Sequence, residues 1–107
     1  MTASKKQRRV ERRALARVAA KVVRERERLA HAEVGGRPEN PLEISTASLV
    51  ELHARSMPCP LCGSTMRVDE HTAETIDEDR LRIAHVVCVA CGVPRKIYFR
   101  IVVPAPN

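Results

Sequence analysis

Four cysteines, arranged in two pairs, are the residues of this sequence best suited to do chemistry. The first pair lies in Cys59-Pro60-Leu61-Cys62-Gly63 and the second in Cys88-Val89-Ala90-Cys91-Gly92. Two residues separate the cysteines of each pair, and a tight turn of this kind points both sulfurs inward together with backbone N–H groups. The glycine after each second cysteine supplies the backbone freedom that such a turn needs. Two such turns brought together by a β-hairpin complete a tetrahedral site of four thiolates.

We therefore predict one structural Zn²⁺ ion as the cofactor of this chain. The predicted ligands are Cys59, Cys62, Cys88 and Cys91. Four thiolates suit zinc and leave no coordination position open, so the predicted ion is structural rather than catalytic. An iron–sulfur centre, disulfides or a redox dithiol are the alternatives. His71 and His85 are not needed as ligands.

The chain as a whole is short and poor in aromatic residues. It has 107 residues, of which 44% are hydrophobic, but it has only one Tyr and one Phe. A core built from Val, Leu, Ile and Ala in so short a chain usually needs a metal or disulfides to stabilise it. No stretch approaches the roughly 20 apolar residues of a membrane span, and residues 1–9 lack the apolar segment of a secretory signal. We expect a soluble, cytoplasmic protein (nuclear if eukaryotic), with an organellar transit peptide as the alternative.

Three segments alternate between apolar and polar residues as strands do. They begin near Met66, Arg80 and Lys96, and an acidic loop over residues 74–79 joins the first two. We expect a three-stranded antiparallel sheet with one apolar face, covered either by a short helix around residues 49–52 or by the apolar side of an N-terminal helix. The other face is predicted to gather basic residues round one aromatic ring, which can stack a base and hold phosphates. These residues are Arg80, Arg82, Lys96, Tyr98 and Arg100. An ordinary solvated strand face is the alternative.

Residues 57–103 resemble the zinc-ribbon superfamily, in which two CxxC turns clamp one end of a three-stranded antiparallel sheet. The segments Val86–Gly92 and Lys96–Phe99 are most similar to the C-terminal ribbon of S-II-type transcription elongation factors. That resemblance implies a place in the RNA polymerase active centre for an acidic pair at the hairpin tip, in the region Asp77-Glu78-Asp79. Counted back from Cys88, however, the family's pair falls on Asp79-Arg80. The resemblance is therefore specific for fold and metal rather than for transcript cleavage.

The N-terminal third of the chain is predicted to be one long helix. No Gly or Pro occurs between Ser4, a suitable N-cap, and Gly35. At 100° per residue, apolar side chains form a narrow stripe, which we call the seam. The seam consists of Leu15, Val18, Val22 and Leu29. Basic side chains step by three or four residues along the opposite side, which we call the ridge. The ridge consists of Arg9, Arg13, Arg17, Lys21, Arg24 and Arg28.

The ridge indicates a polyanionic partner. Residues 1–37 hold 12 basic and 4 acidic groups, whereas residues 38–107 hold 7 basic and 9 acidic groups. Like charges at ridge spacing repel one another unless an anion lies along them, and a nucleic-acid backbone supplies such a line of charge. The alternative is a solvated helix whose seam packs on the body of the protein or on a second copy. A membrane surface is disfavoured because the seam has no Trp or Phe.

The sequence thus predicts an α+β protein in three parts. Residues 1–34 form a basic amphipathic helical arm, residues 35–56 a linker and short helix, and residues 57–104 a zinc ribbon. The short helix is expected to be capped by Ser45, Thr46 or Ser48 and to pack an apolar side against the body, formed by Leu49 and Leu52 with Val50 as a further candidate.

The predicted function is that of a non-enzymatic accessory factor that binds DNA or RNA, or an assembly such as RNA polymerase or the ribosome. No nucleophile–base pair, open metal site or phosphate-binding glycine loop suggests an enzyme or a small-molecule substrate. The alternative is a protein–protein adaptor that dimerises or docks on a partner through the seam.

Overall fold

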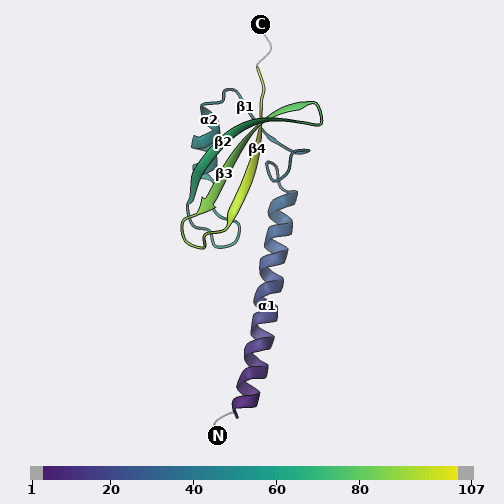
Figure 1. Cartoon of the computed structure of the whole chain (residues 1–107), viewed down its shortest axis with the longest axis vertical. Coiled ribbons are helices and arrows are strands. Elements are labelled where there is room, and N and C mark those ends of the chain that lie inside the picture. The colour runs from purple at the N-terminus through teal and green to yellow at the C-terminus, as the bar shows by residue number, and fades with distance from the viewer. Residues whose placement is uncertain (1–3, 104–107) are drawn as a thin grey trace.

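The computed structural model describes residues 4–103 and contains two helices and one four-stranded sheet. The elements follow the order α1, β1, α2, β2, β3, β4, which confirms the α+β class. Figure 1 shows a small body formed by the sheet and α2, with α1 running along one side of it and far beyond. The molecule consequently measures 76 × 25 × 23 Å. Residues 1–3 of the predicted arm and residue 104 of the predicted ribbon lie outside the described residues.

Helix α1 spans Lys5–Ala32 and begins at the predicted cap. The Ser4 Oγ accepts the backbone N–H of Gln7 at 3.2 Å, and the Gln7 Oε1 accepts the backbone N–H of Ser4 at 3.0 Å. This reciprocal pair satisfies two of the donors that a helix start leaves free. The helix ends before Gly35, which has a φ of 89° and therefore cannot belong to a right-handed helix. Within residues 4–103, no helix is both long and apolar enough to cross a membrane.

The sheet is mixed, with four strands in the order β1-β4-β3-β2. Strand β3 (Asp79–Cys88) pairs antiparallel with both β2 (Met66–Ile76) and β4 (Pro94–Ile101), whereas β1 (Leu42–Ile44) runs parallel to β4. The predicted three-stranded antiparallel ribbon is therefore wrong. Strand β1 was not predicted because three residues are too few to show alternation. It pairs with the outer edge of β4, where the Val102 N–H also donates to the Ile44 carbonyl at 2.8 Å.

The predicted acidic loop over residues 74–79 is also corrected, because the strands continue through most of it. Strand β2 ends at Ile76 and β3 begins at Asp79, which leaves only Asp77 and Glu78 in the turn. Both turn residues have positive φ, 47° and 70°, as a two-residue hairpin turn that follows the sheet's twist requires.

Helix α2 (Leu49–Ser56) packs against β2 and β3 and covers one face of the sheet. Its buried residues are Val50 and Ala54, one turn apart. Of the predicted apolar side, Val50 is buried, whereas Leu49 and Leu52 are exposed. The ring of His53 meets Phe99 edge-on, with a centroid distance of 5.7 Å. The apolar side of α2 is therefore set by small residues that let the helix approach the sheet.

The core lies between α2 and the sheet. It is built almost entirely of aliphatic side chains with one ring, and two cysteines belong to it. Its buried members are Ile44, Val50, Ala54, Cys59, Met66, Ala84, Val86, Cys88, Ile97 and Phe99. None of the residues Lys5–Ala32 is buried, so the seam of α1 does not cover the sheet.

Replacing the single aromatic ring of this core tests its contribution to stability. Phe99 is fully buried, and Phe99→Ala should lower the free energy of unfolding of the metal-loaded protein by about 3–5 kcal/mol, because it removes apolar contacts and leaves a cavity. Denaturant titration followed by far-UV circular dichroism measures the change. Leu52→Ala is the matched control, since Leu52 is 60% exposed and should cost less than about 0.5 kcal/mol. Equal losses in both variants would contradict this packing.

Candidate metal centre

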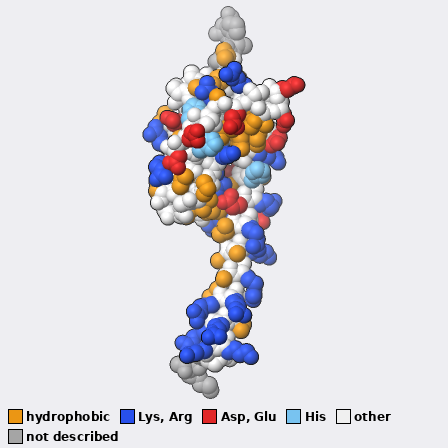
Figure 2. All heavy atoms as spheres, viewed as in Figure 1, with side chains coloured by type: hydrophobic (Ala, Val, Ile, Leu, Met, Phe, Trp, Pro, Cys, Tyr) orange, Lys and Arg blue, Asp and Glu red, His pale blue; other side chains and the backbone are white. Residues whose placement is uncertain are grey.

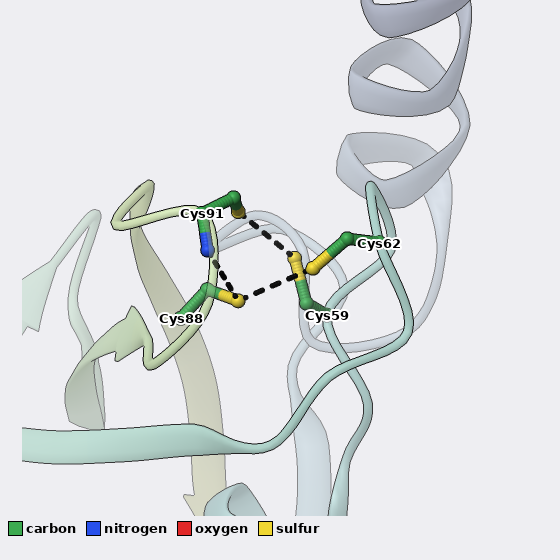
Figure 3. Close-up of side chains that lie close together, drawn as sticks. All are labelled: Cys59, Cys62, Cys88 and Cys91. Atoms are coloured by element: carbon green, nitrogen blue, oxygen red, sulfur yellow. Dashed lines mark hydrogen bonds between the residues drawn. The ribbon is translucent and has the colours of Figure 1, made fainter.

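The two cysteine turns lie side by side at one end of the sheet (Figure 3). The first turn connects α2 to β2, and the second connects β3 to β4. Met66, at the start of β2, is opposite Cys88, at the end of β3. The backbone N–H of Val89 also donates to the carbonyl of Thr65 at 3.1 Å. The antiparallel pairing of β2 and β3 therefore brings together turns that lie far apart in the sequence.

Both turns use the same backbone hydrogen bonds. The Gly63 N–H donates to the Cys59 carbonyl at 2.7 Å, and the Gly92 N–H donates to the Cys88 carbonyl at 3.0 Å. In each turn the N–H of the first cysteine donates to the carbonyl five residues on. Gly63 and Gly92 have φ of 76° and 73°, in the left-handed region that glycine adopts most easily. The repeated pattern explains why a glycine follows each CxxC.

The four sulfurs have the spacing of a single metal site. All four lie within 4.8 Å of one another. The Sγ atoms of Cys59 and Cys91 are 3.8 Å apart, and those of Cys62 and Cys88 are 3.4 Å apart. Four thiolates in a tetrahedron at a Zn–S distance of about 2.3 Å would be about 3.8 Å apart. A disulfide requires a S–S distance of about 2.05 Å, and all four cysteines are free. The predicted ligands therefore come together and can hold one metal ion.

The thiols differ in acidity because backbone donors reach some of them. The Cys91 N–H, which donates to the Cys88 Sγ at 3.4 Å, is the main cause that lowers the pKa of Cys88 to about 6, against the effect of burial. The Ser64 N–H lowers the pKa of Cys62. The Val93 N–H acts in the same direction on Cys91, but the Cys88 sulfur and burial outweigh it and raise the pKa of Cys91 to about 11. Four adjacent thiolates thus need a cation to coexist.

The metal centre forms the boundary between core and solvent. Cys59 and Cys88, the first cysteine of each turn, are buried, whereas Cys62 and Cys91 are exposed. An ion held here would be fixed on one side by the core and remain reachable on the other. Such a site is open to a chelator without prior unfolding of the sheet.

Helix α1 contacts the first cysteine turn and strand β4, which the sequence did not indicate. The Arg26 Nη1 donates to the carbonyl of Leu61, between the cysteines of the first turn, at 2.6 Å. Arg95, shortly after the second turn, donates to both carboxylate oxygens of Glu27 at 3.1 and 2.9 Å. A cavity of about 280 Å³ lies beside these contacts, lined by Ala30 and Ile97 among others. Polar contacts rather than a packed core thus hold α1 against the body.

The pairing of β3 with β4 divides the predicted basic face into two groups. Arg82 is opposite Phe99, and Ile83 is opposite Tyr98. Because opposite residues share a face and successive residues alternate, Lys96, Tyr98 and Arg100 lie on one face, whereas Arg80 and Arg82 lie on the other. Arg100 also donates to Asp79 at 2.9 Å. The five residues therefore do not form one surface.

The ridge residues are all exposed on α1. Among residues 4–103, the ion pairs of the structure include Arg28, which donates to Glu25 at 3.2 Å, but none of the other five ridge residues. Figure 2 shows Lys and Arg side chains gathered over the arm below the body. The structure therefore places the predicted ridge along a helix surface that the body leaves open.

Comparisons of this chain with models of protein families, with curated proteins and with solved structures found no match. The metal centre thus rests on the geometry of the chain's own residues.

Removing one sulfur should separate the stability of the body from that of the arm. We expect Cys62→Ser to lower metal affinity sharply and to unfold the sheet, because metal binding and folding are coupled in a four-thiolate site. The helicity of α1 should largely persist, since its side chains contribute nothing to the buried core. Elemental analysis measures the bound metal, and amide exchange by NMR reports each element separately.

Val89→Ala serves as the control, because Val89 lies between the cysteines of the second turn but is 59% exposed. It should retain one ion per chain and a protected sheet. A Cys62→Ser protein with full metal content, or a metal-free protein with a fully protected sheet, would rule out the predicted coupling.

Proposed function

We propose that this protein is a non-enzymatic accessory factor that binds the phosphate backbone of a nucleic acid, free or within an assembly such as RNA polymerase or the ribosome. One structural Zn²⁺ ion stabilises the body, and the ridge of α1 holds the phosphates. The observation that carries the proposal is that α1 extends far beyond the body with its ridge exposed.

The donor set supports zinc as the ion. Four thiolates are soft ligands, and their spacing suits the tetrahedral geometry that zinc adopts in structural sites. Four ligands from the protein leave no position for a water or substrate, so the ion supplies folding energy and no chemistry. Zinc rather than iron should be found by elemental analysis of protein purified from its natural host.

The geometry of the ridge supports a linear anion as its ligand. From Arg9 to Arg28 the ridge spans 19 residues, or about 28 Å at the helical rise. Basic residues at spacings of three and four repel one another along this length. Phosphates placed beside them would remove the repulsion and release counterions, and this gain does not depend on base sequence. We therefore propose binding without strong sequence preference.

One sheet face is proposed as a secondary contact. Lys96, Tyr98 and Arg100 share a face, so Tyr98 can stack on an unpaired base while the two cations approach phosphates. A single ring supplies little affinity, and this contact is subordinate to the ridge. Arg80 and Arg82, on the opposite face, are proposed only as peripheral charges.

The resemblance to S-II-type ribbons suggests RNA polymerase as one assembly to test, but we do not propose the cleavage activity of those factors. Of the acidic residues near the hairpin tip, Asp79 accepts a hydrogen bond from Arg100 at 2.9 Å and is therefore engaged within the sheet. A ribbon's function depends on its individual site and not on its fold alone. The proposed role in transcription or translation thus rests on the ridge.

Salt dependence tests the proposed ridge contacts. If about five phosphates are neutralised on duplex DNA, the logarithm of the affinity should fall against the logarithm of salt concentration with a slope of about −4 to −5. Arg13→Gln should weaken binding to any duplex and reduce the slope by about 1, because it removes one phosphate contact. Fluorescence anisotropy with a labelled duplex and a labelled RNA hairpin gives both values.

Arg55→Gln is the matched control, since it removes one exposed charge from α2 in the body. Its slope should equal that of the unmodified protein. A flat salt response, or equal losses for Arg13→Gln and Arg55→Gln, would exclude the ridge as the binding surface.

A further inference from the structure

We propose that the seam of α1 is a docking surface for an acidic amphipathic helix of a partner protein. The proposal concerns a different side of α1 from the ridge and does not depend on nucleic-acid binding. It rests on two observations: the seam is exposed to solvent, and the positions that flank it carry positive charge. The short apolar length of the seam and this positive charge then disfavour a second copy of this chain as the partner.

The seam is exposed although it is the apolar stripe of a long helix. Leu15 is 70% exposed, Val18 62%, and Val22 and Leu29 nearly half. The body contacts α1 through Arg26, which lies beside the seam, and through Glu27, which lies more than a third of a turn from it. Neither contact covers Leu15, Val18 or Val22. Figure 2 shows hydrophobic side chains at the surface of the arm below the body. An apolar stripe of this kind along a projecting helix is typical of an interaction surface.

The seam follows a heptad pattern. Leu15, Val22 and Leu29 are seven residues apart, at position a, and Val18 falls at position d. Glu25 occupies the next d position, and its carboxylate accepts a hydrogen bond from Arg28 at 3.2 Å. Its charge is therefore matched within α1. The apolar part of the seam covers about two heptads.

The positions that flank a heptad seam decide which helices can pair with it. In α1 the e and g positions between residues 5 and 28 carry five basic residues and none that is acidic. The basic ones are Lys5, Arg12, Lys21, Arg26 and Arg28, and the others are Gln7, Ala14 and Ala19. Arg26 is held by the Leu61 carbonyl and Arg28 by Glu25, so Lys5, Arg12 and Lys21 are the flanking cations left for a partner. In a pair of helices these positions face the corresponding positions of the partner. Favourable pairing with α1 therefore requires Asp or Glu there.

A second copy of this chain does not meet that requirement. In a parallel pair of α1 helices, Lys21 of each copy would face Arg26 of the other, and like charges across an interface are unfavourable. In either orientation no e or g position of α1 offers an acidic partner. The apolar seam is also shorter than the three to four heptads that usually sustain a coiled coil. A partner helix with acidic flanks would replace the like-charge repulsion with attraction. This attraction would also compensate for the short apolar contact.

The ridge and the seam can be occupied at the same time. Arg9, Arg13, Arg17 and Arg24 fall at the outer heptad positions b, c and f, away from the seam. Lys21 and Arg28 alone belong to both the ridge and the flanks. An acidic helix on the seam therefore leaves most of the ridge accessible to an anion.

Binding of designed peptides to the metal-loaded full chain tests the proposal. The probe is a labelled helix of about three heptads with Leu at a and d and Glu at e and g, and its counterpart has Gln at e and g. Fluorescence anisotropy should show at least tenfold tighter binding of the Glu peptide. The double variant Val18→Ser/Val22→Ser should lose this binding by about tenfold or more, because it removes the apolar centre of the seam.

Val10→Ser is the matched control, since Val10 is an exposed apolar residue of α1 that lies off the seam. It should bind the Glu peptide unchanged. The exposed positions allow each variant to fold, which metal content and circular dichroism verify. Equal affinity for the Glu and Gln peptides would overturn the proposal that the flanks select an acidic helix. Undiminished binding by the Val18→Ser/Val22→Ser protein would overturn the seam as the docking surface and show that the peptide binds the ridge. A dimer in sedimentation that this double variant abolishes would establish a second copy as the occupant and overturn the proposal.

Discussion

The approach of the four sulfurs at one end of the sheet is the constraint on which the body of this protein depends. Strand β2 begins shortly after the first cysteine turn, and β3 ends at Cys88 in the second, so the cluster fixes the register of the hairpin at its open end. Cys59 and Cys88 also belong to the small core, which has one aromatic ring. A core of this size contributes little stability by itself. An ion bound here would therefore stabilise strand pairing and core together.

Local patterns predicted the parts of this structure that local physics determines. The CxxC-Gly spacing identified both turns because the left-handed glycine and the inward sulfurs depend only on neighbouring residues. Ser4 as N-cap, the absence of Gly and Pro, and the apolar period of α1 predicted a long helix for the same reason. Alternation located the three long strands. These signals lie within a few residues of the structure that they specify.

The errors concern features that depend on how distant segments pair. Strand β1 is defined only by its partner β4. Within β3, alternation correctly places Ile83 and Arg82 on opposite faces of the sheet. The sequence of β3 alone does not say which residues of β4 share a face with Arg82. The register places Arg82 with Phe99 and buries Ile83 beside Tyr98, so both faces of β3 carry buried residues. The contacts of Arg26 with the first cysteine turn and of Glu27 with Arg95 in β4 were not predicted for the same reason, since charged residues on a solvated helix give no signal of a distant partner.

The attachment of α1 near one of its ends has a geometric consequence. Arg26 and Glu27 fix the helix close to the cysteine turns, whereas Lys5 lies 21 residues further along, or about 31 Å at the helical rise. A change of about 10° in the direction of the helix at its attachment would displace its free end by about 5 Å, roughly the pitch of one helical turn. A small change of direction at this attachment thus becomes a large displacement at the tip, so the contacts of Arg26 and Glu27 set where the distal charges point.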